Sequence, residues 1–296
     1  MATKEKHTRR PKPTGDPLTR WHDNLARKVG SYAFLTVAVA VAIIPLWHVT
    51  IAALGNSRPA GDPASWWPGQ LSLDNFYALM RDTEFLRWLS NSLVVAAGVT
   101  VVGVFLSATA GYALSRFRFF GRMTVLNSLM VTQIFPATML LLPIFLLLVH
   151  WQLINTFFGL MLVYLATVLP FCIWQMKSFY DSVPETIEEA ASMDGCTPAE
   201  IFRRVVLPVS APGLAVTALF SFAAAWNEYV VAAIILQDSK AFTLPLGLRL
   251  LHEDAAAGQP GLFAAGALLV TLPMMGLYLV LSRLFLSRAR DVGLRF

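Results

Sequence analysis

Residues 185–208 read ETIEEAASMDGCTPAEIFRRVVLP, a polar stretch that lies between two long hydrophobic blocks. Most connections between membrane spans are short or irregular, but this one carries the start and stop signals of two short helices. A rigid polar element on the face of a hydrophobic protein has little use unless another molecule docks against it. The stretch therefore predicts a docking surface.

Two capping boxes mark the expected helix starts. Ser182 and Glu185 have the S-x-x-E spacing, and Thr197 and Glu200 repeat it as T-x-x-E. Pro198 follows the second cap at the first helical position, where its missing N–H costs nothing. The pattern predicts one helix after Glu185 and a second one after Thr197.

The helix ends and faces are also predictable. Gly195 can adopt the left-handed backbone that ends the first helix, and Pro208 is expected to stop the second. Helical spacing groups these apolar positions: Ile187, Ala190 and Ala191 in the first helix, and Ile201 and Val205 in the second. Helices that lie on lipid favour Lys and Arg on their polar face. The first helix is acidic and rich in alanine, which favours a protein partner over the membrane surface.

The rest of the chain has the composition of an all-α polytopic membrane protein. Of its 296 residues, 56% are hydrophobic and 14% are charged, whereas about a quarter of the residues in soluble domains are charged. Apolar blocks of about 20 residues can cross a hydrocarbon core, and they should be helical because lipid offers the backbone no hydrogen-bond partner. Six spans are expected, at about 31–54, 92–114, 125–149, 156–176, 212–236 and 262–286.

The placement of Lys and Arg predicts the orientation of these spans. Of the 23 basic residues, 18 fall on the side that holds both termini and the 177–211 loop. The other five fall in two loops on the opposite side, 55–91 and 237–261. Both termini and the 177–211 loop are therefore expected in the cytoplasm, and the net charge of +5 needs no nucleic acid partner.

Three regions are expected along the chain. Residues 1–30 form a basic tail without hydrophobic periodicity, predicted to be disordered. Residues 31–286 form the transmembrane region, and 287–296 form a C-terminal tail. Cys172 lies in a hydrophobic span and Cys196 in the polar loop, so a disulfide is not expected.

The sequence has no motif for catalysis, nucleotide binding or metal binding. It lacks the G-x-x-x-x-G-K-[ST] phosphate loop, a dinucleotide glycine fingerprint and H-E-x-x-H, and its five histidines are scattered. No acid, base, nucleophile or metal set converges. A membrane enzyme is therefore disfavoured, and no cofactor or metal is expected on this chain.

The polar stretch reproduces a long, fixed spacing, EAA-x3-G-x9-I-x-LP. Glu189-Ala190-Ala191 supply EAA, Gly195 the glycine and Leu207-Pro208 the final pair, with Val205 in place of isoleucine. On this motif the chain resembles the membrane subunits of binding-protein-dependent ABC importers, over roughly residues 88–287.

Three further segments are similar to the MalG-type sugar permeases within that family: 111–121 (GYALSRFRFFG), 226–228 (WNE) and 242–244 (FTL). The resemblance implies a type I importer fold, in which the first polar helix is a coupling helix seated in a cytoplasmic ATPase. The residues it assigns to coupling are Glu185, Glu188, Glu189, Ala190, Ala191, Asp194, Gly195, Val205, Leu207 and Pro208. The C-terminal tail, 288–296, departs from the small, Gly-rich tail of related permeases.

The resemblance also implies partners and a location. The partners are a second, MalF-like permease, two ATP-binding subunits that use ATP and Mg, and an extracytoplasmic solute-binding protein that the 237–261 loop reaches. The location is the plasma (inner) membrane of a bacterium or archaeon. The cargo would be a sugar such as maltose, maltodextrin or trehalose, while a phosphorylated polyol or another carbohydrate remains open. The rival mechanism is an ion-coupled secondary transporter, but the internal repeats often seen in that class are not found here.

One acidic residue, Glu228, lies deep in a predicted span. Placing a charge there costs about 2.5–3.5 kcal/mol on insertion scales, so it should face water, a partner or a proton. Asn227 and Tyr229 flank it, and Gln133 lies in the third span. These residues are candidates for the translocation path, and a structural hydrogen bond between helices is the alternative.

Overall fold

The computed structural model describes residues 17–55, 71–134, 137–256 and 260–291. All regular elements in these ranges are helical, apart from one isolated bridge between Gly55 and Leu71, which confirms the predicted all-α class. The long helices are α1 (Pro17–Leu54), α3 (Phe85–Arg116), α6 (Phe157–Ser182), α10 (Ala211–Asn227) and α13 (Pro260–Asp291). The shorter ones are α2 (Asp74–Asp82), α4 (Arg122–Thr132), η2 (Ala137–Leu140), α5 (Leu141–His150), α7 (Thr186–Met193), α8 (Pro198–Glu200), η3 (Ile201–Val206), α9 (Leu207–Val209), α11 (Val230–Ile235), η4 (Ser239–Ala241) and α12 (Leu244–Ala256).

Four helices are long and apolar enough to cross a membrane: parts of α1 and α13 and the whole of α3 and α6. Four of the predicted spans coincide with them. The helical segment Pro198–Val209 and α10, bent by 75°, make a fifth candidate if the pair counts as one span. These counts refer only to the ranges that the structure describes.

The other two predicted spans are divided among shorter helices. The 125–149 span falls on α4, η2 and α5, with residues 135–136 outside the described ranges. Pro143 lies in the first turn of α5, where it lacks the N–H that would continue a helix from Met139. The 212–236 span is interrupted after Asn227, where the backbone of Glu228 is extended.

The chain divides into two compact units, residues 1–49 and 50–296. The first contains most of α1, a helix of 38 residues with Pro45 in its interior and a length of about 57 Å. Residues 17–30, predicted as part of a disordered tail, belong to this helix, while 1–16 lie outside the described ranges. Its large apolar side chains, such as Phe34 and Leu35, are exposed, as expected for a helix in lipid.

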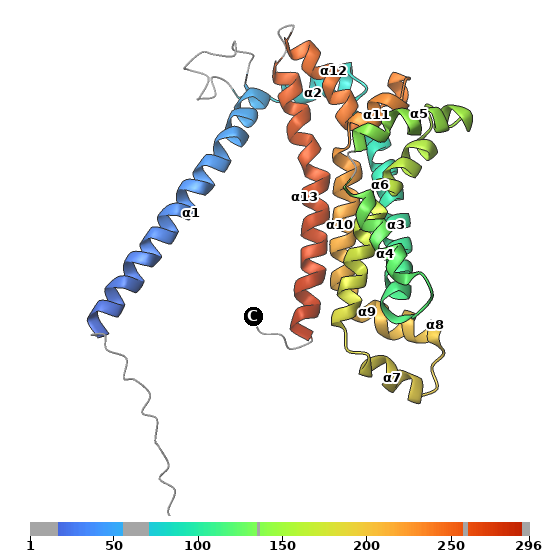
Figure 1. The fold of residues 1–296 in the computed structure, drawn as a ribbon. Helices are drawn as coiled ribbons and strands as arrows, with labels where there is room; N and C mark the ends of the chain where they lie inside the picture. Colours follow the sequence, from blue (N-terminus) through green and yellow to red (C-terminus); the bar gives the residue numbers. More distant parts are fainter. Residues whose placement is uncertain (1–16, 56–70, 135–136, 257–259, 292–296) are drawn as a thin grey trace, which may run out of the picture. The chain divides into compact units, whose positions relative to one another are not determined.

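In the second unit α3, α6 and α10 pack against one another, and α13 packs along α10 (Figure 1). Small residues allow the closest approach. A Cβ added to Gly111 of α3 would lie 2.8 Å from Cβ of Met176 and 3.0 Å from the backbone N of Lys177, both on α6. Small residues at membrane-helix contacts commonly serve this purpose. Gly111 therefore sets the spacing of α3 and α6 near the end that carries α7.

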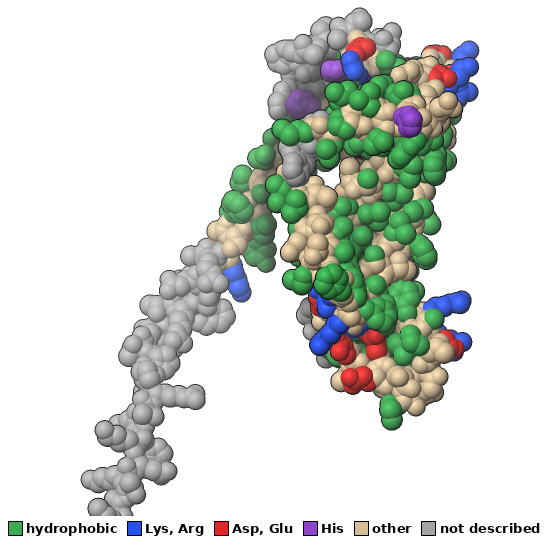
Figure 2. Space-filling view, turned by 45° about the vertical axis from the view of Figure 1, so that its right-hand side comes forward, with side chains coloured by type: hydrophobic (Ala, Val, Ile, Leu, Met, Phe, Trp, Pro, Cys, Tyr) green, Lys and Arg blue, Asp and Glu red, His purple; other side chains and the backbone are tan. Residues whose placement is uncertain are grey.

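The two ends of the second unit differ in what they carry. α2, α11 and α12 lie at one end, and α7, α8 and α9 lie at the other (Figure 1). Figure 2 shows that charged side chains gather at these ends, while the wall between them is largely hydrophobic on the visible face. This distribution is the one expected when the middle of the unit lies in lipid.

The Gly111 contact predicts a difference between two glycines of the same helix. Gly111→Ala should destabilise the protein by about 1–3 kcal/mol, because the new methyl group meets backbone and Cβ atoms that cannot move aside. Gly98→Ala is the matched control, because its Cβ would meet only the flexible end of Met161. Thermal unfolding of both variants in detergent measures the difference. Equal unfolding temperatures for Gly111→Ala and Gly98→Ala would contradict the close packing of Gly111 against α6.

Candidate coupling site

The first helix of the polar stretch, α7, starts differently from the prediction. Glu185 occupies its N-cap without a side-chain cap, and Ser182 is still the last residue of α6, with its hydroxyl donating to the carbonyl of Phe179 at 2.6 Å. The predicted Ser182–Glu185 capping box is therefore wrong. The box does not form because α6 extends through Ser182, so the Ser182 hydroxyl bonds back to the carbonyl of a residue in its own helix.

The end of α7 follows the prediction. Gly195 has a φ of +85°, the left-handed conformation that glycine adopts without a steric penalty. The N–H of Gly195 donates to the carbonyl of Ser192 at 3.0 Å, and the N–H of Cys196 donates to that of Ala191 at 3.1 Å. These two bonds make a Schellman motif, which turns the chain sharply into the next helix.

The second capping box is present as predicted. The N–H of Glu200 donates to Oγ1 of Thr197 at 3.4 Å, and the N–H of Thr197 donates to Oε2 of Glu200 at 3.1 Å. Pro198 occupies the first turn. The helical path then continues through the π-turn η3 to Val209, one residue past Pro208, and bends by 75° into α10. Pro208 thus lies inside the last turn instead of after it.

The π-turn changes which valine faces inward. Val206 is buried together with Ile201, whereas Val205 is only half-buried. A π-turn places residues five apart on one face, in contrast to the spacing of four used in the prediction. The pairing of Ile201 with Val205 is therefore wrong by one residue. The sequence IFRRVV contains no motif that predicts this π-turn.

The inward face of α7 consists of Glu188 and Ala191, and Ile187 and Ala190 are exposed. The predicted apolar face of Ile187, Ala190 and Ala191 is thus also wrong. Ala191 packs with Cys196 against a small core whose buried members are Met176, Tyr180, Ile201 and Val206. This core holds the helix pair to the end of α6. Cys172 and Cys196 are both free, as expected from the sequence.

Glu188 bonds to the end of α3. Its Oε1 accepts from Nε of Arg116 at 2.6 Å, and its Oε2 accepts from the hydroxyl of Tyr112 at 2.7 Å. The side chains of Arg116 and Glu188 are only 10% and 14% exposed. Sequence reasoning did not identify Tyr112 and Arg116, because nothing along the chain links residues more than 70 positions apart.

The remaining residues assigned to coupling lie toward the outside or in the connection to α10. Exposed positions are Glu185, Glu189, Ala190, Asp194, Gly195 and Pro208, and half-buried ones are Val205 and Leu207. Two carboxylates and an alanine thus face outward from α7 and its N-cap. This part of the chain therefore presents negative charge and a small side chain at its surface.

Three of the four candidate path residues, Asn227, Glu228 and Tyr229, form the break between α10 and α11. The carboxylate of Glu228 accepts from the N–H of Val231 at 3.1 Å and from that of Ala232 at 3.2 Å, and so caps α11. The hydroxyl of Tyr164 donates to Oε2 of Glu228 at 3.0 Å. Just before the break, Nε1 of Trp226 donates to the carbonyl of Val270 on α13. Val270 lies ten residues after Pro260, the first residue of α13. The break is therefore about 15 Å along α13 from its N-terminal end.

The structure brings Gln133 and Glu228 to the same stretch of α6. Gln133 donates to the carbonyl of Thr167 at 3.4 Å, and Thr167 is three residues beyond Tyr164, on the same helix face. Asn227 is exposed and donates to its own helix at Ala223. These three candidates are thus held by ordinary hydrogen bonds within the chain.

Tyr229, the fourth candidate, points instead toward α12. Its hydroxyl accepts from Nη1 of Arg249 at 2.8 Å. This bond and one to Glu253 raise the pKa of Arg249. Tyr229 is therefore tied to the end of the unit that lies opposite α7.

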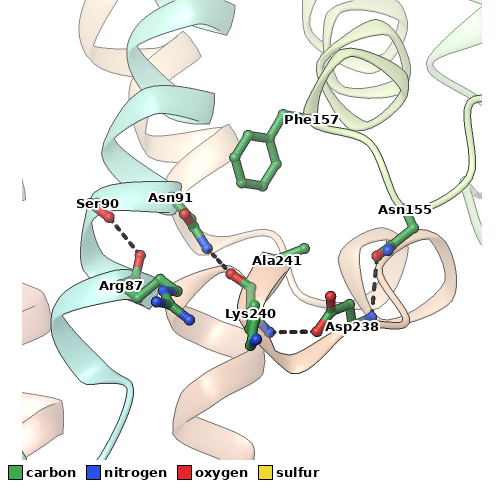
Figure 3. A pocket seen from close by; sticks show the side chains of 8 residues that line it. All are labelled: Arg87, Ser90, Asn91, Asn155, Phe157, Asp238, Lys240 and Ala241. Carbon is green, nitrogen blue, oxygen red and sulfur yellow. Dashed lines mark hydrogen bonds between the residues drawn. The ribbon is translucent and has the colours of Figure 1, made fainter.

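At that opposite end lies an open polar pocket of about 640 Å³ (Figure 3). Asn91 of α3 donates to the carbonyls of Lys240 and Phe242, each at 2.9 Å. Oδ1 of Asn155 accepts from the N–H groups of Gln237 and Asp238. The residues that line the pocket are Arg87, Ser90, Asn91, Asn155, Phe157, Asp238, Lys240 and Ala241. These bonds fix the 237–242 segment onto α3 and onto the connection that precedes α6.

Comparisons with known proteins agree with the motif. Residues 92–290 match the family described as "Binding-protein-dependent transport system inner membrane component". The maltodextrin transport system permease protein MdxG of Bacillus subtilis (strain 168) is 34% identical over 89% of this chain and 94% of its own length. The trehalose transport system permease protein SugB of Mycobacterium tuberculosis (strain CDC 1551 / Oshkosh) is 31% identical over 87% of this chain and 94% of its own.

The fold also resembles a solved structure. A chain of a bacterial ABC transporter involved in the import of the acidic polysaccharide alginate superposes with a TM-score of 0.77 and 21% identity, covering 92% of this chain and 99% of that one. The family match spans α3 to α13 and includes the whole helix pair with its EAA spacing. The chain therefore belongs to the inner membrane components of binding-protein-dependent transport systems, as a multi-pass permease subunit of an ABC importer and not an enzyme.

Proposed function

We propose that this chain is a MalG-like permease that imports an oligosaccharide, with energy transmitted by partner ATPases through α7. The observation that carries the proposal is the EAA segment, which folds as a capped helix pair with an acidic, alanine-containing outer face. The relatives named for maltodextrin and trehalose transport support a glucose-based oligosaccharide as cargo. A galacto-oligosaccharide remains a second candidate, because GanQ of Bacillus subtilis is 31% identical over 88% of this chain.

The proposed assembly contains a second homologous permease, two ATP-binding subunits and a solute-binding protein. The binding protein docks on the face that carries the 237–261 segment, and the fixed 237–242 stretch supplies a rigid base for that contact. The chain crosses the membrane six times, with α4 and α5 sharing the third crossing and α10 and α11 sharing the fifth. Gln133, Asn227, Glu228 and Tyr229 line or border the path, near the break that interrupts the fifth crossing.

Gly195 offers a direct test of coupling. Gly195→Val should strain the turn by roughly 1–2 kcal/mol, because a β-branched residue disfavours the left-handed conformation. α7 should then tilt, and the complex should lose ATPase subunits or sugar-stimulated hydrolysis. Uptake and hydrolysis are measured in proteoliposomes that contain all subunits.

The wild type should require ATP for uptake and be insensitive to ionophores, which separates it from an ion-coupled transporter.

Gly121→Val is the matched control for this experiment. Gly121 has a φ of +87° and, like Gly195, has open space around its Cβ position, so the backbone strain is equal but lies outside the helix pair. If Gly195→Val complexes kept their subunit composition and wild-type stimulation, residues 185–208 would not be the coupling element.

Glu228 separates a path role from a structural role. Glu228→Gln keeps an oxygen that accepts from the N–H groups of α11 but removes the negative charge. We expect uptake to fall severalfold while the complex still purifies. Glu228→Ala removes the cap as well and should cost a further 0.5–2 kcal/mol or so of stability. Normal uptake by Glu228→Gln, together with failed assembly of Glu228→Ala, would leave only the structural role.

Topology is testable with two exposed positions, Ala199 and Ser239. In a background where Cys172 and Cys196 are replaced, a cysteine at Ser239 should react with an impermeant thiol reagent added outside intact cells. A cysteine at Ala199 should react only after the membrane is opened. Labelling of position 199 from outside would reverse the proposed orientation.

A further inference from the structure

Arg116, the last residue of α3, connects three elements at the end of the unit that carries α7. Its Nε donates to Oε1 of Glu188 on α7 at 2.6 Å. Its Nη2 donates to the carbonyl of Val183, the C-cap of α6, at 2.9 Å. Its Nη1 donates to Oγ of Ser115 at 3.2 Å. Every guanidinium nitrogen therefore has a partner, and two of the three partners belong to other elements.

A second layer of bonds supports this arrangement. Tyr112, one turn before Arg116 on α3, donates to the other carboxylate oxygen of Glu188 at 2.7 Å. The hydroxyl of Ser115 donates to Asp181 on α6 at 2.6 Å, and Lys177 pairs with the same aspartate. Both oxygens of Glu188 are thus used within the chain, in contrast to the exposed Glu189 beside it.

The chemistry of the contact suits a rigid link. Charge-assisted hydrogen bonds are shorter and stronger than neutral ones, and this pair is nearly shielded from water, so salt screens it little. The planar fork of arginine can bond the carboxylate of Glu188 and the carbonyl of Val183 together, whereas lysine presents a single point charge. The cation also lies at the C-terminal end of α3, where the helix dipole favours it.

We propose that Arg116 is a positioning residue for energy coupling: it joins α7 to α3 and α6, so that a displacement of α7 is passed directly to the two membrane helices. This inference rests on the proposed function of α7 as the contact with the ATPase. Without Arg116, α7 keeps its apolar core, its two chain connections and the single bond from Tyr112 to Glu188, but it loses the ionic contact with α3 and the link to Val183 at the end of α6, which allows it to rock. The ATPase would still bind the outer face, but part of its movement would be lost.

The test uses the full complex in proteoliposomes, with uptake and ATP hydrolysis measured on the same samples. The variants are Arg116→Ala, Arg116→Lys and Glu188→Gln, where glutamine keeps the hydrogen bonds but not the charge. Arg118→Ala is the matched control, because Arg118 is an exposed arginine two residues away with no ion pair among the described residues. The decisive readout is sugar transported per ATP hydrolysed, which a purely structural role would not change in assembled complexes.

We expect Arg116→Ala to assemble and to hydrolyse ATP. The amount of sugar transported per ATP should fall by roughly fivefold or more, in line with common coupling energies. Arg116→Lys should fall between Arg116→Ala and the wild type, and Arg118→Ala should match the wild type. Spin labels at the exposed Ala190 and Phe120 should report a broader distance distribution in Arg116→Ala.

An unchanged transport ratio in Arg116→Ala, or an equal loss in Arg118→Ala, would overturn the proposal. If Arg116→Ala does not assemble, the proposal is tested with the two milder variants, Arg116→Lys and Glu188→Gln. Normal ratios in both, or failure of both to assemble, reduce Arg116 to a structural residue. A wild-type complex without ATP-dependent uptake is a different result, which removes the proposed function and this inference with it.

Discussion

Backbone N–H and C=O groups inside a bilayer have no water to bond, and this constraint governs the irregular parts of the chain as much as its helices. Where α10 is interrupted, the carboxylate of Glu228 accepts from the free N–H groups at the start of α11. At the start of α6, the hydroxyl of Thr156 accepts from the N–H of Gly159. A polar residue in a span can therefore arise from the need to satisfy a helix break, before any role in transport is considered.

The same constraint makes the packing of α3 on α6 decisive for the position of α7. Two membrane helices gain nothing by hiding apolar surface from lipid, so their contact depends on close fit. Gly111 supplies that fit one residue before Tyr112, and Arg116 follows one turn later. The bonds that fix α7 thus originate beside a close approach of the two helices, and the position of α7 depends on the spacing of α3 and α6.

The EAA segment combines two requirements in one short motif. Ala191 packs inward and Gly195 makes the turn, so these positions build the helix pair itself. Glu189 and Ala190 face outward and remain open to a partner. Within the motif, one alanine therefore packs against the protein's own core and the other remains exposed.

Much of the architecture was determined by local sequence. Hydrophobic length predicts α1, α3, α6 and α13, because a membrane span needs about 20 apolar residues and each of these helices contains such a stretch. The turn at Gly195 and the cap at Thr197 follow from preferences of single residues for particular backbone conformations. The EAA spacing was sufficient to indicate the family.

Only the tertiary structure decided which side chains face inward and what they contact. The π-turn η3 places Val206 on the buried face, where the sequence pattern predicted Val205. The extension of α6 through Ser182 removes the cap predicted there. In both places, tertiary packing outweighs weak local preferences. The sequence assigns Glu189 to the EAA motif, but it does not show which of the neighbours Glu188 and Glu189 faces inward. They differ in the structure because one faces Arg116 and Tyr112 across more than 70 residues of chain, and such a contact exists only once the helices have assembled.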